Sequence, residues 1–246
     1  MDLTVLGCSG SYPTAETMCS GYLLRHDGSS IWLDAGSGTM GELQKHVKLD
    51  DVGAIVLSHS HMDHCGDLYP FFYAALFDTP PRDVYAPSGV RDRLGLLIGK
   101  ESTDAFVTRL RWHELDAGST IDVGPFSIEA FEAVHSTRNN TMRITAGGRV
   151  LTYSGDTAAN PHLARAAREA HVFLCESTWT NDQKGLMGPV HLSAGETGDA
   201  AAAAGCERLL ITHIWPTNDR NTIKEQAAER FLGTIDLALE TRTITI

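Results

Sequence analysis

The chain has 246 residues, of which 42% are hydrophobic and 21% are charged, which is enough to bury a substantial core. It carries 20 Lys and Arg against 31 Asp and Glu, a formal net charge of -11, so contact with nucleic acid through neutralised phosphates is not expected. No apolar run reaches the roughly 18 residues of a membrane-spanning helix, and the N-terminus lacks the basic start of a signal peptide. We therefore expect a cytoplasmic protein without membrane contact.

Short runs of Val, Ile, Leu, Phe and Tyr predict strands at residues 3–6, 21–24, 31–33, 54–57, 127–133, 150–153, 171–175 and 208–211. Apolar periodicity and end signals predict helices at residues 41–47, 67–77, 161–170, 194–204 and 222–231. No linker rich in Pro, Gly or Ser divides the chain. We expect one domain over residues 1–246 with a layered α/β architecture.

Two of the predicted helices have explicit start signals. Asn160 before Pro161 combines a side-chain acceptor at the N-cap with a proline at the first helical position. Ser193 with Glu196 forms a capping box, and Gly205 suits the end of the same helix. The five cysteines are odd in number and form no C-x-x-C pair, so we expect reduced thiols and not a disulfide framework.

Three histidines and an aspartate crowd into the segment His59-Ser60-His61-Met62-Asp63-His64, directly after a predicted strand. Imidazole and carboxylate are ligands suited to Zn, Mn or Fe. His59 and His61 are two apart on an extended segment, so their side chains point the same way. Asp63 and His64 are expected to turn into a following helix and to serve a second ion.

His135, Asp156 and His213 each follow the carboxyl end of another predicted strand. Ligand sites of α/β sheets form at that edge. Four separate strands would therefore deliver candidate ligands to one place.

His191 precedes the helix that Ser193 caps. A helix N-terminus offers free N–H groups to an anion, so this imidazole is suited to contact a phosphate oxygen. Glu176, at the end of a predicted strand, could orient His191 or relay a proton. Trp179 and Trp215 are candidates for stacking on a base, and Arg138 and Arg143 are candidates for phosphate contacts.

The six-residue histidine segment, His135, Ser154-Gly155-Asp156-Thr157 and Thr212-His213-Ile214 resemble, in order, the motifs of the metallo-β-lactamase fold superfamily. The resemblance implies an αββα four-layer sandwich of two similar halves, with two metal ions at its edge. It implies that His59, His61 and His135 hold one ion, that Asp63, His64 and His213 hold the other, and that Asp156 bridges them.

Glu176-Ser177-Thr178-Trp179 and His191-Leu192-Ser193-Ala194 resemble the phosphodiesterase branch that contains ribonuclease Z. The arm that grips tRNA in ribonuclease Z would lie between His135 and Asp156, where this chain has 20 residues, enough for two strands and a turn. Val5-Leu6-Gly7-Cys8-Ser9-Gly10-Ser11 and His213-Ile214-Trp215-Pro216 are similar to actinobacterial cyclic-nucleotide phosphodiesterases of this fold. This implies hydrolysis of 3′,5′-cyclic AMP or related phosphodiesters, and a homodimer.

The expected chemistry is attack by a hydroxide that bridges two divalent ions, Zn first, with Mn, Fe or Co as alternatives. Coordination lowers the pKa of water from about 15.7 to about 7. Asp63, His191 and Glu176 are the expected catalytic residues, with His191 stabilising charge or protonating the leaving oxygen. A small phosphodiester is the expected partner.

Three alternatives remain open. One is an acyl hydrolase acting on a lactone or thioester, and another is a ribonuclease Z-type tRNA 3′-endonuclease without the arm. The third is a metal-binding module without catalysis, although structural zinc sites are usually rich in thiolates and these candidate ligands include no cysteine.

Overall fold

The computed structural model describes residues 1–99 and 102–246, and within them two mixed β-sheets of seven strands face each other. The first sheet has the order β14-β1-β2-β3-β4-β5-β6. Its strands are β1 (Asp2–Gly7), β2 (Gly21–His26), β3 (Ser29–Ala35), β4 (Ala54–Val56), β5 (Arg82–Ala86), β6 (Leu110–Glu114) and β14 (Thr243–Thr245). Strands β14, β1, β2 and β3 pair antiparallel, and β3 to β6 pair parallel.

The second sheet repeats this arrangement with the order β13-β12-β11-β10-β9-β8-β7. Its strands are β7 (Thr120–Val123), β8 (Phe126–Glu132), β9 (Asn140–Ala146), β10 (Arg149–Tyr153), β11 (Val172–Glu176), β12 (Arg208–Thr212) and β13 (Thr234–Leu237). Strands β7 to β10 pair antiparallel, and β10 to β13 pair parallel. Each sheet is therefore antiparallel in one half and parallel in the other.

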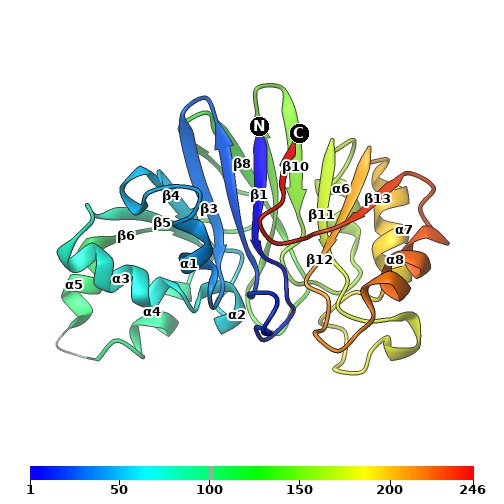
Figure 1. Ribbon diagram of the computed structural model, residues 1–246, viewed down its shortest axis with the longest axis horizontal. Helices are drawn as coiled ribbons and strands as arrows, with labels where there is room; N and C mark the ends of the chain where they lie inside the picture. Colours follow the sequence, from blue (N-terminus) through cyan, green and yellow to red (C-terminus); the bar gives the residue numbers. More distant parts are fainter. Residues whose placement is uncertain (100–101) are drawn as a thin grey trace.

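Helices cover the outer face of each sheet (Figure 1). The first sheet carries α1 (Thr39–Leu43), α3 (Leu68–Phe77), α4 (Val90–Gly95) and α5 (Thr103–Arg109), and the second carries α6 (Pro161–Ala166), α7 (Ala194–Ala204) and α8 (Arg220–Ala228). The short helix α2 (Met62–Cys65) and the 3-10 turns Leu49–Asp51 and Asn181–Gln183 lie in connections. None of the helices in the described part of the chain has the length and apolar character needed to cross a membrane.

The alternation of side chains along the strands creates these layers. In β2, Tyr22 and Leu24 belong to the core between the two sheets, whereas Leu23 packs toward the helices with Phe71 and Phe72 of α3. A third apolar cluster joins β11 and β12 to α6, α7 and α8. The fold is thus the predicted αββα four-layer sandwich, because a strand presents successive residues to opposite faces and both faces of each sheet are covered.

All eight predicted strands form. The five predicted helices form as well, that at residues 194–204 with the predicted ends and the other four with shifted ends. The first predicted helix, residues 41–47, spans Thr39–Leu43, and the third, residues 161–170, already ends at Ala166. The sequence missed β5, β6, β7, β9, β13 and β14 and the helices α4 and α5. Charged residues interrupt the apolar pattern of β5 and β6, where Arg111 and Asp83 pair across the strands at 2.6 Å.

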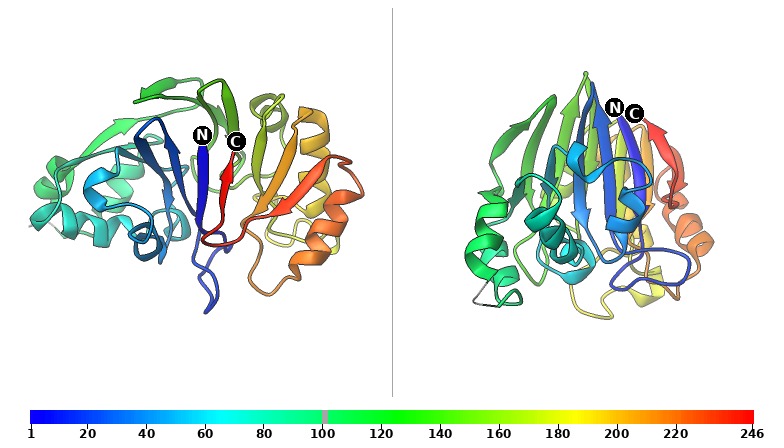
Figure 2. Two further views of the ribbon diagram at one scale, coloured as in Figure 1. Left: turned by 45° about the horizontal axis from the view of Figure 1, so that its top comes forward. Right: turned by 60° about the vertical axis from the view of Figure 1, so that its left-hand side comes forward.

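The caps agree with the sequence. The Asn160 side chain accepts the N–H groups of His162 and Leu163 at the start of α6. Ser193 and Glu196 form the capping box of α7, and Gly205 ends that helix with a φ of 62°. The chain termini pair as β1 and β14 and lie next to each other at the upper edge of the sandwich (Figure 2). The helix α2 and the loop after β12 lie at the opposite edge (Figure 1).

Candidate metal centre and active site

Three histidines and one aspartate converge where β4, β8 and β10 end. His59 Nε2 lies 3.1 Å from His61 Nδ1, and His135 Nε2 lies 3.1 Å from the same atom. Asp156 Oδ2 lies 3.7 Å from His59 Nε2 and 3.9 Å from His135 Nε2. These four side chains form the first cluster, and their ligand atoms all lie within 4.8 Å of one another.

A second cluster contains Asp63, His64 and His213, again with Asp156. Asp156 Oδ1 lies 3.1 Å from His64 Nε2 and 3.3 Å from His213 Nε2. Asp63 Oδ2 lies 3.2 Å from His213 Nε2 and 3.5 Å from His64 Nε2. Asp156 therefore turns one carboxylate oxygen to each cluster, which is the geometry of a bridging ligand.

The donor sets fit a pair of divalent cations. Buried polar atoms are normally hydrogen-bonded, yet His64 Nε2 and Asp156 Oδ1 have no hydrogen-bond partner among the described residues. These two atoms converge with the other ring nitrogens and carboxylate oxygens of the clusters, and a cation between them would satisfy both. Nitrogen and oxygen donors without thiolate suit Zn, Mn, Fe or Co.

Electrostatics favour the ligand forms of these groups. Burial lowers the pKa of His61 to about 4, with His135 adding to the effect, and burial also lowers the pKa of His59 well below its usual value. These imidazoles are therefore neutral. Burial acts in the opposite direction on Asp156, but the neighbouring His213 and His64 hold its pKa well below the usual range, so the carboxylate is ionised.

His64 is surrounded by carboxylates. Burial disfavours its charged form, but Asp156, Asp63 and Asp34 outweigh burial and hold the pKa of His64 well above its usual value. The three carboxylates create a strongly negative environment at the second cluster. A divalent cation would take the place of the proton there.

Backbone geometry fixes Asp156. The preceding Gly155 has a φ of +58°, and a Cβ built there would lie 2.8 Å from the Asn140 carbonyl oxygen. Only glycine meets both conditions. Asn139 Nδ2 donates to the Asp156 carbonyl at 2.7 Å, which holds the turn after β10 in place.

Asp34, at the carboxyl end of β3, contacts the second cluster and was missed by the sequence analysis. Its Oδ2 lies 2.7 Å from His64 Nδ1, and it also accepts hydrogen bonds from Tyr153 Oη and Ser58 Oγ, each at 2.7 Å. This contact leaves His64 Nε2 to face the second cluster. The available signal was an acidic residue directly after a predicted strand, the same signal that identified Asp156.

Two further histidines are oriented through the ring nitrogen that points away from the clusters. His135 Nδ1 donates to the Val190 carbonyl at 2.8 Å. His213 Nδ1 lies 3.0 Å from Thr178 Oγ1. Such contacts fix the ring and leave the other nitrogen free for a metal.

His191 and Glu176 form a pair beside both clusters. His191 Nδ1 lies 3.0 Å from Glu176 Oε1 and 4.0 Å from Asp156 Oδ2. Glu176 is completely buried and accepts the backbone N–H groups of Thr157 and Leu192 at 2.6 and 3.2 Å. Burial lowers the pKa of His191, but Glu176 more than offsets burial and raises it to about 9. Glu176 therefore favours the imidazolium form of His191.

The predicted free N–H groups at the start of α7 are not available, so this expectation was wrong. Ala194 N donates to the Trp179 carbonyl, Gly195 N donates to the Asn181 side chain, and Ser193 N donates to the Glu196 carboxylate. An anion near His191 would meet the imidazolium and not the helix N-terminus.

The other candidate substrate contacts differ in how accessible their side chains are. Trp179 is only 2% exposed and packs between His191 and Trp215, so it offers no free face to a base. Trp215 is half-buried. Arg143 donates to the carbonyls of Ala166 and Arg168 at the end of α6, each at 2.8 Å, which contradicts a phosphate contact. Arg138 is exposed and binds Ser88 and Asp116.

A model of the Beta-lactamase superfamily domain matches residues 29–214. "Uncharacterized protein Rv1339" of Mycobacterium tuberculosis is 37% identical over 95% of this chain and 88% of that protein. "Probable metallo-hydrolase YhfI" of Bacillus subtilis is 27% identical over 97% of both chains. Its crystal structure superposes with a TM-score of 0.90 at 25% identity, over 99% of each chain. Human tRNase Z, short form, has a similar fold, with a TM-score of 0.80 at 22% identity over 100% of this chain and 99% of that one.

Proposed function

Because the chain belongs to the beta-lactamase superfamily, we propose that it is a binuclear metal-dependent phosphodiesterase that hydrolyses small phosphodiesters, 3′,5′-cyclic nucleotides such as cyclic AMP in particular. Membership of the family makes it a metal-dependent hydrolase. The assignment of its substrate depends on the residues that surround the two clusters.

The single observation that carries the proposal is the contact between His191 and Glu176, 3.0 Å apart beside the bridging Asp156. A buried imidazolium at this place can bind a phosphoryl oxygen or give a proton to the alkoxide that leaves when a phosphodiester is cleaved. Glu176 keeps that proton on His191, because its buried carboxylate favours the charged form. Phosphoryl transfer gains from both effects.

The proposed roles follow from position. His59, His61 and His135 would hold one ion, Asp63, His64 and His213 would hold the other, and Asp156 would contact both. When bound, two divalent ions activate water near neutral pH and neutralise the phosphoryl oxygens. Asp63 is itself held in place by the N–H of Ser11, which donates to its Oδ2 at 2.9 Å. His191 holds the proton that the leaving oxygen receives, and Glu176 positions it.

Zinc is the metal we propose, since the donors are nitrogen and oxygen atoms. Mn, Fe and Co are alternatives, because the metal that a protein binds in the cell also depends on which metals are available. The five free, buried cysteines agree with the proposed cytoplasmic location. A homodimer is part of the same proposal and is checked by light scattering after size-exclusion chromatography.

A tRNA 3′-endonuclease is a weaker second candidate. "Ribonuclease Z" of Halobacterium salinarum is 24% identical over 87% of both chains. In this chain, however, the segment between His135 and Asp156 is occupied by the hairpin of β9 and β10, closed by Gly147 and Gly148. The net charge of -11 also disfavours a polyanion.

The test is a substrate panel offered to protein reconstituted with Zn or Mn: cyclic AMP, a pre-tRNA, a thioester and a lactone. We expect metal-dependent release of AMP as the fastest reaction. Faster turnover of the thioester or the lactone would assign the chain to acyl hydrolysis, and faster cleavage of the pre-tRNA would assign it to RNA processing. Either result would overturn the proposal.

A further inference from the structure

The loops that carry the candidate ligands contain few basic residues, and those are already engaged. The described loops at this edge and the first residue of α8 supply Arg138, Lys184 and Arg220. Arg138 binds Ser88 and Asp116, Lys184 pairs with Glu196 at 2.9 Å, and Arg220 donates to the Ala238 carbonyl. The Lys and Arg side chains of these described loops are therefore not free to hold the part of a substrate that extends beyond the metal clusters and His191.

Several large apolar side chains on these loops are exposed to solvent. Met62 lies between two candidate ligands, Val134 precedes His135, and Leu186 and Met187 lie on the loop that leads to His191. Tyr12, on the loop after β1, is 43% exposed. These exposed apolar side chains come from the loops at the edge that carries the candidate ligands.

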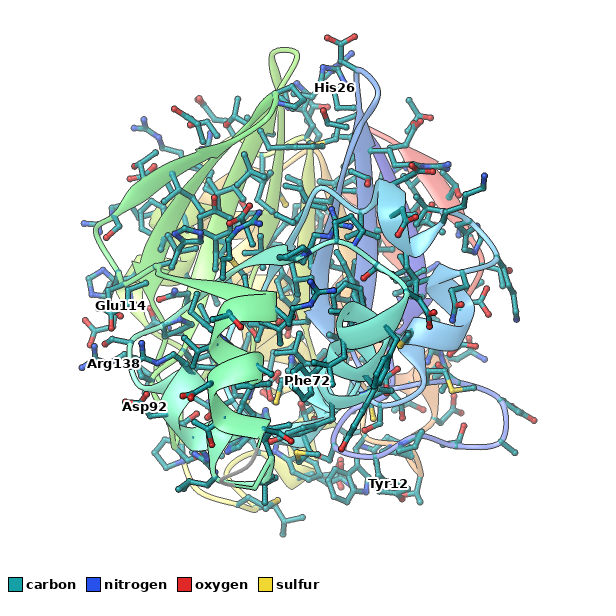
Figure 3. All side chains as sticks on the ribbon, turned by 90° about the vertical axis from the view of Figure 1, so that its left-hand side faces the viewer. Tyr12, His26, Phe72, Asp92, Glu114 and Arg138 are labelled. Carbon is teal, nitrogen blue, oxygen red and sulfur yellow. The ribbon has the colours of Figure 1, made fainter. Side chains whose placement is uncertain are left out.

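Tyr12 is fixed next to the second cluster by backbone contacts. The neighbouring Ser11 donates its N–H to Asp63, and the Ser9 side chain donates to the Tyr12 carbonyl at 2.8 Å. Gly10 N donates to the Ile214 carbonyl at 3.0 Å, which lays this loop along the segment that follows His213. Tyr12 lies at the lower edge of the molecule in Figure 3, at the end opposite His26.

An aromatic series connects Tyr12 to His191. The ring of Tyr12 meets that of Trp215 edge to face at 5.7 Å, Trp215 packs on Trp179 at 5.1 Å, and Trp179 meets His191 at 6.4 Å. Trp179 is buried, so Tyr12 and Trp215 carry the accessible end of the series. Trp215 also lines a cavity of about 230 Å³. Thr14, Thr17 and Asn218 line the same cavity, together with the charged residues Glu16, Arg220 and Glu240.

We propose that Tyr12 and Trp215 form the binding surface for an aromatic ring, such as a nucleobase, carried by the phosphodiester substrate. This inference rests on the proposed function and adds the class of substrate. Stacking on aromatic side chains tolerates different bases because every base has a π-face. The hydroxyl and amide groups around the cavity can then meet the polar edge of the ring.

The test compares cyclic AMP with its abasic counterpart, methyl ribofuranoside 3′,5′-cyclic phosphate. Tyr12→Ala should raise the KM for cyclic AMP about tenfold, the scale of one stacking contact, and leave the abasic substrate unchanged. Tyr12→Phe keeps the ring and should behave as wild type. Tyr73→Ala, which removes another exposed tyrosine (56%) on α3, is the matched control and should change neither substrate.

Equal effects of Tyr12→Ala on both substrates, or no effect on either, would overturn the inference while leaving the phosphodiesterase intact. A binding measurement separates it from failure of the proposed function. AMP should quench the tryptophan fluorescence, and Tyr12→Ala should weaken that binding about tenfold even if neither substrate is hydrolysed. Unchanged AMP binding in Tyr12→Ala would contradict the inference by itself.

Discussion

The Nδ1 atom of His64 lies 2.7 Å from Oδ2 of Asp34, and both side chains are completely buried. Asp34 has a φ of +54° and so aims its carboxylate into the space between the sheets, where it also accepts from Tyr153. Asp34 therefore orients His64, a proposed metal ligand, without being a proposed ligand itself. Residues of this kind control metal affinity strongly.

Asp34→Asn should weaken metal binding at the second cluster about 10- to 100-fold, because the amide replaces a charged acceptor. Asparagine tolerates the left-handed backbone, so the fold should persist. Titration against a chelator measures the affinity, and Asp50→Asn, an exposed acid in the turn Leu49–Asp51, is the control. Unchanged affinity in Asp34→Asn would show that the buried carboxylate does not support the metal.

His191→Ala and Asp156→Ala should separate chemistry from metal binding. Asp156 faces both clusters, so Asp156→Ala should lose both metal ions and all turnover. His191→Ala should keep both ions and lose about 10²- to 10⁴-fold in kcat, the range for a general acid. Elemental analysis and kinetics on the same samples measure both effects. If His191→Ala also loses metal, the division of roles is wrong.

Gly155→Ala should destabilise the protein by about 2 kcal/mol or more, because a Cβ there clashes with backbone as well as occupying a left-handed φ. Gly148 also has a positive φ, +74°, but a Cβ built there has no neighbouring atom within 4 Å, so Gly148→Ala is the comparison. It should cost only about 1 kcal/mol. Urea unfolding compares the two variants. Equal losses would mean that the contact with Asn140 carries no energy.

The five thiols should be unreactive in the folded protein at pH 8. Burial raises the pKa of Cys19 and Cys65 to about 12 and that of Cys206 to about 11, and burial raises the pKa of Cys8 and Cys175 as well. Since only the thiolate reacts, alkylation should require unfolding and then modify five sites. Because the folded-state pKa values exceed those of the unfolded chain, stability should fall as the pH rises from about 9 toward 12. Rapid labelling of native protein at pH 8 would contradict this.

Much of the fold was predictable because the strands nearest the core are continuous apolar runs, as in β4, β11 and β12. Strand β9 was missed because Asn140, Thr141 and Arg143 interrupt the pattern, although Met142 and Ile144 point into the core between the sheets. This alternation is that of a strand with one face on the core, but with only two large apolar residues it was overlooked.

The convergence of the site was predictable because each candidate ligand follows a strand, and the carboxyl ends of those strands meet at one edge. The role of these residues as metal ligands remains a prediction. Asp34 was missed because a single aspartate before Ala35 and Gly36 also fits a turn. The occupied N-terminus of α7 was missed because Trp179 and Asn181, which accept from it, are close only in the folded chain.

Bound metal and AMP release, measured together in wild type and in Asp156→Ala, test the binuclear phosphodiesterase most directly. We expect two divalent ions per chain and hydrolysis of cyclic AMP that depends on them, with both lost in the variant. Wild-type protein that carries two ions and releases no AMP would contradict the cyclic-nucleotide phosphodiesterase.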